Sequence, residues 1–218
     1  EEISPDLTRN EESKQGPGGA PITNEGAGGE NYNTLSYVIE SIHEKGVIYT
    51  GSDCGLVHIT KDGGKTWENI TPSGLPESLI QSIEVSPHDK GTAYIAATRY
   101  KFNDFSNMSF KTIDYGKTWT KIDTGVDKDD FIKVIREDKK VKDLLYGGAE
   151  RGFYISFNGG SNWQKLQLNL PLVPITDMAF ADNDLVISTA GRAFWILDDL
   201  SALQQSKGNF SGLKIYTP

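Results

Sequence analysis

The sequence predicts an all-β fold built from repeats, on three observations. A short motif that ends in tryptophan occurs at 60–67, 112–119 and 156–163. Short β-rich runs alternate with turn signals along the chain, and no long segment has the 3.6-residue period of a helix. Two strand-like runs precede each copy of the motif, so one repeat holds about four strands, as one blade of a β-propeller does.

The repeated motif has the chemistry of a hairpin turn. Its Asp or Asn side chain can bond backbone N–H groups that no neighbouring strand reaches, and its Thr or Ser hydroxyl can add a further bond. Its glycine accepts a positive φ, and its tryptophan covers the turn with a large apolar surface. The residues in these roles are Thr60, Asp62, Gly64 and Trp67, then Thr112, Asp114, Gly116 and Trp119, then Ser156, Asn158, Gly160 and Trp163.

Taken in order, the repeats divide residues 34–218 into four expected blades, 34–75, 76–126, 127–170 and 171–218. The first two strands are expected at 35–40 and 47–51, at 80–85 and 92–97, and at 131–136 and 144–148. The fourth repeat has strand-like runs at 175–180, 185–189 and 193–197 but no copy of the motif. We therefore expect a β-propeller of four-stranded antiparallel blades, with about four blades in this sequence.

The N-terminal residues match the end of a repeat. Ile3-Ser4-Pro5 corresponds to Ile70-Thr71-Pro72, so we expect residues 1–8 to be an outer strand from a preceding blade. Residues 9–33 are rich in Gly and Pro and predict a flexible loop. An open arc of blades leaves strand edges unpaired. Either four blades close a ring, or the arc is part of a larger propeller, which is the arrangement we favour.

Composition limits the partners of the chain. It has 22 basic and 30 acidic residues, a net charge of −8, which argues against nucleic acid and anionic membrane surfaces. No apolar run approaches the roughly 18 residues of a membrane-spanning helix, so we expect no membrane insertion. The single cysteine, Cys54, excludes an internal disulfide framework. No spacing of residues indicates a metal site, and we expect no cofactor.

The motif resembles the Asp-box, or BNR, repeat of sialidases, xyloglucanases and sortilin-type receptor propellers. A wider set of residues resembles large exported bacterial proteins of the sortilin-like or glycosyl-hydrolase-like BNR-repeat type. That set comprises residues 3–8, 51–67, 166–171 and 190–199. The resemblance implies a β-propeller, and it alone implies a secreted, periplasmic or cell-envelope location.

We expect ligands at the turns between the second and third strands, on the face opposite the Asp-box turns. The candidate ligand-binding residues there are Asp53, Arg99, Tyr100, Glu150, Arg151 and Arg192. A cluster of arginines could grip a carboxylate or sulfate. In the alternative, each arginine pairs with a neighbouring acid and joins adjacent blades. An insertion at 99–111 carries aromatic side chains that could stack on sugar rings, anchor a peptide or fold back over the blade.

No catalytic residue can be assigned from the sequence. Glycoside hydrolysis needs two carboxyl groups about 5–9.5 Å apart, and Asp53 and Glu150 come from non-adjacent blades. The Arg-Ile-Pro motif that a sialidase would share with its family does not occur. We therefore expect a binding or scaffolding module that recognises a polypeptide or glycan and contacts other blades or domains of its parent chain. The alternative is a portion of a BNR-repeat glycoside hydrolase.

Overall fold

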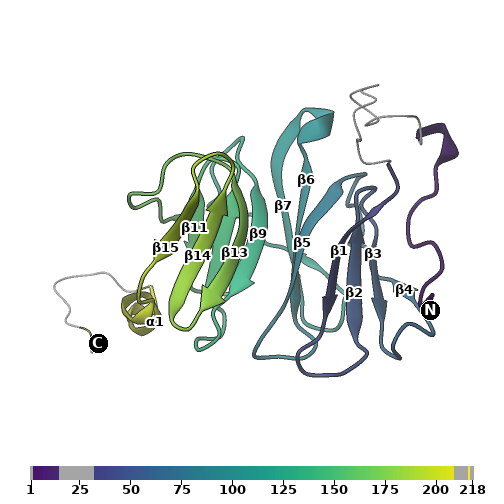
Figure 1. Ribbon diagram of the computed structural model, residues 1–218, viewed down its shortest axis with the longest axis horizontal. Helices are drawn as coiled ribbons and strands as arrows, with labels where there is room; N and C mark the ends of the chain where they lie inside the picture. Colours follow the sequence, from purple (N-terminus) through teal and green to yellow (C-terminus); the bar gives the residue numbers. More distant parts are fainter. Residues whose placement is uncertain (1, 15–31, 209–215, 217–218) are drawn as a thin grey trace.

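The computed structural model describes residues 2–14, 32–208 and 216 as four antiparallel sheets that follow one another along the chain (Figure 1). The first sheet holds β1 (Leu35–Glu40), β2 (Ile48–Ser52), β3 (Val57–Thr60) and β4 (Glu68–Asn69). The second holds β5 (Leu79–Val85), β6 (Ala93–Arg99), β7 (Asp104–Thr112) and β8 (Thr120–Lys121). The third holds β9 (Ile132–Glu137), β10 (Leu145–Ala149), β11 (Phe153–Ser156) and β12 (Gln164–Lys165), and the fourth holds β13 (Ile175–Ala181), β14 (Asp184–Thr189) and β15 (Phe194–Leu197).

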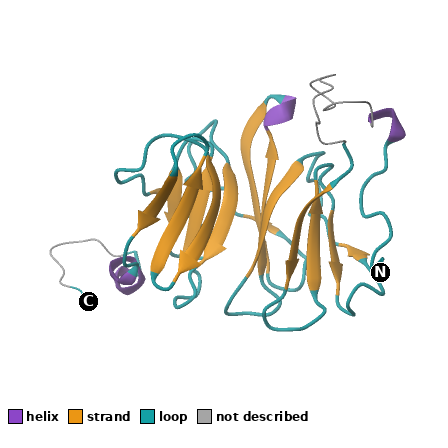
Figure 2. Ribbon diagram, in the orientation of Figure 1, coloured by secondary structure: helices purple, strands orange, loops and turns teal. Residues whose placement is uncertain are grey.

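The all-β prediction is confirmed, and the helices are short. They are η1 (Glu12–Lys14), η2 (Tyr100–Phe102) and α1 (Ser201–Ser206), drawn in purple in Figure 2. Within each sheet the strands pair in chain order, which is the up-and-down arrangement of a propeller blade. We refer to the sheets as blades one to four.

Blade four has three strands, close to the three strand-like runs in its sequence, where the other blades have four. In the other blades, an N–H of the Asp-box turn donates to the carbonyl of the turn between the first two strands, as Gly63 does to Gly46 at 3.0 Å. In blade four Leu200, just before α1, donates to Asn183 in the same way at 2.9 Å. Helix α1 therefore stands in the place of the Asp-box turn that the sequence of blade four lacks.

Two predictions for the N-terminal segment are not tested by the fold. Residues 2–11 contain no strand, so their origin in a preceding blade stays a prediction. Most of the predicted flexible loop, residues 15–31, lies outside the described residues, as do 209–215 at the other end of the chain.

The hydrophobic core consists of three clusters, one at each contact between blades. Blades one and two meet at a cluster around Tyr49, Ile59 and Ile95. Blades two and three meet around Tyr94, Ile135 and Trp163, and blades three and four around Tyr146, Ile175 and Leu185. Because the clusters lie between sheets, each blade depends on its neighbours for the burial of its apolar faces.

The Asp-box turns are closed by the bonds that the sequence predicts. In the first, the Thr60 hydroxyl donates to Asp62 Oδ1 at 2.8 Å and accepts the Gly64 N–H at 2.9 Å. Thr66 donates to Asp62 from its N–H at 2.9 Å and from its hydroxyl at 2.6 Å. These bonds from Thr66 lower the pKa of Asp62 to about 2, so its carboxylate stays ionised at acidic pH values where an ordinary aspartate becomes protonated.

The tryptophan of each Asp-box also bonds to a chain segment that precedes its own blade. The indole Nε1 of Trp119 donates to the carbonyl of Ile70 at 2.6 Å, and that of Trp163 donates to Ile122 at 2.9 Å. Trp67 makes the same bond to Ile3 at 2.9 Å. Ile3 therefore has the position relative to blade one that Ile70 has relative to blade two, which is the register that the sequence match implies.

Two independent constraints require glycine at position 116, in the Asp-box of blade two. Gly116 has a φ of 84° and lies so close to blade one that a Cβ would sit 2.5 Å from Ile70 Cδ1 and 2.8 Å from its Cβ. Gly63, in the first Asp-box, has a φ of 74°, but a Cβ at this position would meet nothing within 4 Å. A comparison of substitutions at these two glycines therefore separates the cost of backbone strain from the cost of a clash between blades.

We expect Gly116→Ala to destabilise the protein more than Gly63→Ala does. Both changes carry the left-handed cost of about 1 kcal/mol, and only Gly116→Ala adds overpacking against Ile70, worth about 1–3 kcal/mol. Urea unfolding of the two variants measures the difference. Equal losses of unfolding free energy would show that the contact between blades contributes nothing.

Candidate functional site

The predicted site residues lie on one side of the fold, at the turns β2–β3, β6–β7, β10–β11 and β14–β15. These turns point upward in Figure 1, and we call this side the upper face. The Asp-box turns lie on the opposite side, as the sequence predicts.

The two candidate carboxylates of the upper face are occupied by local bonds. Asp53 accepts the Thr34 N–H at 2.9 Å and the Thr34 hydroxyl at 3.0 Å. Glu150 forms an ion pair with Lys133 at 3.1 Å. Each group therefore holds its turn to a neighbouring segment, and neither bonds to a second carboxyl group among the described residues.

Arg99 is held within blade two. Its Nε donates to Asp104 at 3.1 Å, a second nitrogen donates to the Glu77 carbonyl, and the guanidinium lies 4.8 Å from the Phe102 ring centre. These contacts match the alternative in which an arginine pairs with a neighbouring acid. Burial and three partners leave Arg99 little freedom to meet a ligand.

Arg151 and Arg192 are more open. Both are exposed, and Arg192 donates to the Gly191 carbonyl at 3.0 Å. Within the described part of the chain, Arg151 bonds only through its backbone N–H, to Asp130 at 3.0 Å. No bond or shared partner joins these two arginines or links them to Arg99 in the described residues. The three arginines that the sequence suggests as a cluster therefore share no contact or partner in the described residues.

The aromatic insertion of blade two partly folds back and partly faces solvent. Tyr100 stacks on the buried Phe131 with ring centres 6.2 Å apart, and Phe105 lies 6.3 Å from the same ring. Tyr100 and Phe105 nevertheless remain 41% exposed. The insertion thus presents partly exposed aromatic rings, which pack against the buried Phe131.

A surface groove of about 460 Å³ runs beside this insertion. Its lining comes from the start of β7 and from the connection between blades two and three, and it includes Phe105, Asn107, Val126 and Asp129. A groove of this volume is in the range of ligand sites. The sequence did not reveal it, because its two walls are distant in the chain.

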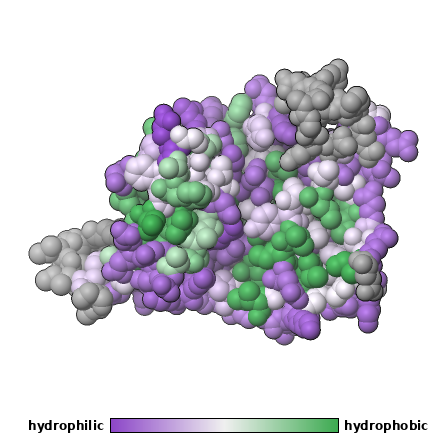
Figure 3. All heavy atoms as spheres, viewed as in Figure 1, coloured by the Kyte–Doolittle hydropathy of each residue, from purple (hydrophilic) through white to green (hydrophobic). Residues whose placement is uncertain are grey.

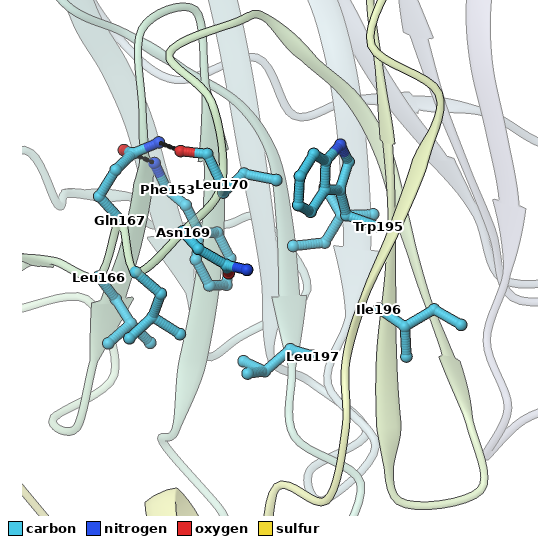
Figure 4. A pocket seen from close by; sticks show the side chains of 10 residues that line it. Phe153, Leu166, Gln167, Asn169, Leu170, Trp195, Ile196 and Leu197 are labelled. Atoms are coloured by element: carbon cyan, nitrogen blue, oxygen red, sulfur yellow. Dashed lines mark hydrogen bonds between the residues drawn. The ribbon is translucent and has the colours of Figure 1, made fainter.

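A second cavity, between blades three and four, is too small for a ligand. Figure 4 shows Phe153, Leu166, Leu170 and Trp195 around it. Its volume of about 30 Å³ leaves room for roughly one water molecule. It lies beside Leu166, whose equivalents Ile70 and Ile122 each meet an Asp-box tryptophan from the next blade.

A polar network along the innermost strands was also missed by sequence reasoning. Arg136 on β9 contacts Glu84 on β5 at 3.4 Å, Asp177 on β13 at 2.6 Å and the Tyr37 hydroxyl on β1 at 3.4 Å. One residue from each blade thus takes part, and we call these four residues the axial network. The available signal was the opposite charge of Glu84 and Arg136, which occupy equivalent positions opposite Tyr94 and Tyr146.

Burial raises the pKa of Glu84 to about 7, although the charge of Arg136 acts in the opposite direction. The Glu84 and Arg136 side chains of the axial network are largely enclosed, 14% and 11% exposed, whereas the Asp177 side chain is 65% exposed. The axial network therefore joins the four blades and keeps the carboxyl group of Glu84 away from solvent. In the described residues, no group of His, Cys, Asp or Glu is arranged to hold a metal ion.

A family model described as "Sortilin, neurotensin receptor 3" matches residues 45–199, more than half of the chain. The chain belongs to the Sortilin-Vps10 family. No curated protein matches it. Among the helices of the described part, none has the length and apolarity to cross a membrane.

Solved structures support the propeller fold of this Sortilin-Vps10 chain. The GH74 xyloglucanase from Xanthomonas campestris matches with a TM-score of 0.60 and 14% identity, over 75% of this chain and 29% of its own. YCF48 bound to D1 peptide matches with a TM-score of 0.58 and 16% identity, over 76% of this chain and 52% of its own. The extracellular domain of BT4673 from B. thetaiotaomicron matches with a TM-score of 0.56 and 14% identity, over 76% of this chain and 21% of its own. The chain thus spans between about a fifth and a half of these structures.

The raised pKa of Glu84 predicts a pH dependence of stability. A folded pKa of about 7 above the ordinary 4.5 means that the contribution of Glu84 is complete below pH 4.5 and is lost as the pH rises through 7. We expect the unfolding free energy to fall over this interval by about 1–3 kcal/mol more in the wild type than in Glu84→Gln.

Denaturant unfolding at a series of pH values measures this effect. The control is Glu68→Gln, a change of the same chemistry at an exposed position on β4. The unfolding free energy of this control should depend on pH as that of the wild type does. An unchanged slope in Glu84→Gln would contradict the assignment.

Proposed function

We propose that this chain is a binding or scaffolding section of a larger propeller protein, with a polypeptide or glycan ligand on the upper face. The observation that carries the proposal is the local bonding of the upper-face carboxylates. Asp53 is bonded to Thr34 and Glu150 to Lys133, so neither is free to act as one of a hydrolytic pair. The open surface of this face includes the aromatic side chains of the insertion and the exposed Arg151 and Arg192, which suits binding.

Both ends of the row of blades carry exposed apolar side chains, which supports partners within the same parent chain. Val38 on β1 is 69% exposed, and Phe194 and Ile196 on β15 are 76% and 59% exposed. Apolar atoms gather over these parts of the surface in Figure 3. Equivalent faces inside the row are buried against the next blade, so we propose that further blades or domains of the parent chain cover the two ends.

The second candidate function is a portion of a BNR-repeat glycoside hydrolase. It is favoured by the match to the GH74 xyloglucanase, which spans three quarters of this chain. At 14% identity that match concerns the fold alone. This candidate requires catalytic carboxyl groups from elsewhere in the parent protein.

We further propose that the parent protein is secreted or belongs to the cell envelope, with no nucleic-acid partner. The likeness to an extracellular domain and the net charge of −8 support this location and this exclusion.

An array of polypeptides and glycans probed with the parent protein tests the binding function. We expect ligands that Arg151→Ala weakens without lowering stability, because the Arg151 side chain holds no bond in the described structure. Arg99→Ala should instead lower the unfolding free energy by about 1–2 kcal/mol, since it removes bonds to Asp104 and Glu77. An array without any ligand, together with hydrolysis of a glycan, would favour the enzyme.

A further inference from the structure

Two joints between blades share one close contact at the innermost strand. Gly51 on β2 lies so near blade two that a Cβ there would be 2.4 Å from the Cγ2 of Ile80 on β5. Gly148 on β10 has the same relation to Ile175 on β13, at 2.5 Å. Each of these joints therefore places an isoleucine of one blade against a small residue of the blade before it, at a packing density that leaves no room for a larger residue.

The rear face of blade four, at the end of the row, has the same arrangement and is open in the described structure. Ser188 on β14 holds the position of Gly148 on β10, since each lies opposite the equivalent residue of its innermost strand. A surface depression of about 120 Å³ lies beside Ser188 and is also lined by Val186 and Phe194. Phe194 is 76% exposed, whereas its equivalent Phe153, which faces blade four, is 2% exposed. The depression can take one branched aliphatic side chain.

The front face of blade one, at the other end of the row, carries the matching side chain. Leu35 on β1 has the position of Ile80 on β5, and it is 47% exposed where Ile80 is fully buried. Val38 on the same strand is 69% exposed, and its equivalent Ile83 is also fully buried. Each end of the row therefore has one half of a blade joint.

The pairing of the fourth strand is divided between the two ends in the same way. In blade one the N–H of Ile70, just after β4, donates to the carbonyl of Val57 at 2.9 Å. The equivalent carbonyl in blade four, that of Phe194, receives no such bond from the described residues. Ile3 has the position of Ile70, as its bond from Trp67 shows, but it follows no strand in the described structure. The front end therefore carries a fourth-strand residue without a third strand, and the rear end carries the reverse.

We infer that the rear end of this chain binds the front end of a second copy, in the geometry of a blade joint. Leu35 of the second copy lies against Ser188 and Phe194, and the Ile3 N–H of the second copy donates to the Phe194 carbonyl. The inference goes beyond the proposed function. Where the parent chain supplies further blades, the same two faces would meet those blades.

A second copy is favoured because this chain supplies both halves of the contact. Blades one and four lie at opposite ends of the row in Figure 1, so one copy cannot bring its own front face to its own rear face. Charge does not block the depression, because Asp177 in its lining already pairs with Arg136 at 2.6 Å. A contact between two different faces is heterologous, so the copies form a closed ring or a longer row.

Sedimentation of the full chain over a range of concentrations tests the inference. We expect the mean mass to rise above that of one copy. The rise should be larger at about 0.5 M than at about 0.05 M salt, because screening reduces the repulsion between copies of net charge −8. A chain that stays monomeric at millimolar concentration would overturn the inference. The proposed binding function would then stand, since the array tests it independently.

Two charged variants identify the two faces. Val38→Glu at the front and Phe194→Glu at the rear change exposed side chains, so each should keep the circular dichroism spectrum of the wild type. We expect each to weaken self-association about tenfold or more, because the joint would bury a carboxylate. The control Ile113→Glu changes a side chain that is 70% exposed in the Asp-box of blade two, away from both ends. It should leave association unchanged, and equal association of all three variants would contradict the proposed faces.

An equimolar mixture distinguishes a head-to-tail contact from a symmetric one. Val38→Glu keeps an intact rear face and Phe194→Glu keeps an intact front face, so the mixture should form dimers that neither variant forms alone. If either variant alone associates as well as the wild type, the contact joins two like ends and the inference is wrong.

The double variant with Leu35→Cys and Ser188→Cys tests the register. At the joint between blades three and four, a Cβ on Gly148 would be 3.0 Å from the Cβ of Ile175, near the separation of about 3.5–4.5 Å in disulfides. Mild oxidation should therefore link copies covalently. Leu35→Cys combined with Ser161→Cys, an exposed position in the Asp-box of blade three, should not link them. Equal linking of the two double variants would rule out this register and the inference with it.

Discussion

The fold depends on one contact that recurs at the joints between blades one and two and between blades two and three. An indole N–H from one blade bonds to a backbone carbonyl of the preceding segment, as Trp119 does to Ile70. The neighbouring box glycine lets the same isoleucine approach to a distance that a Cβ would block. The bond itself is worth about 1 kcal/mol, but it fixes how two sheets face each other. The apolar clusters between blades form in the spacing that it sets.

Much of the fold could be predicted because the Asp-box is closed by its own residues. Thr60, Asp62 and Gly64 satisfy one another within a few positions of the chain, so the sequence contains the whole turn. Strand positions follow from it, and β1 has the predicted bounds. Helix α1 could not be predicted, because six residues carry no clear period. It is supported instead by distant contacts, such as the bond from Gln204 to Asp138.

The candidate site was less predictable, since a sequence shows the position of a side chain in a turn but not its partner. Asp53 and Glu150 lie in turns of the upper face, and Arg99 ends strand β6 beside one. Their partners, among them Thr34 and Lys133, come from other segments and convert apparent ligand groups into supports of the turns. The groove and the axial network each need two or more segments that only the fold brings together.

The axial network determines how far the loss of one contact affects the other blades of this repeat protein. Asp-box bonds connect nearest neighbours, so the failure of one such bond stays at a single joint. Arg136 instead reaches Tyr37 two blades away, together with Glu84 and Asp177 on either side. Loss of this one guanidinium would loosen all four blades at once and leave a buried carboxyl group without its counter-charge. We expect this connection to couple the unfolding of the four sheets, as in a single compact domain.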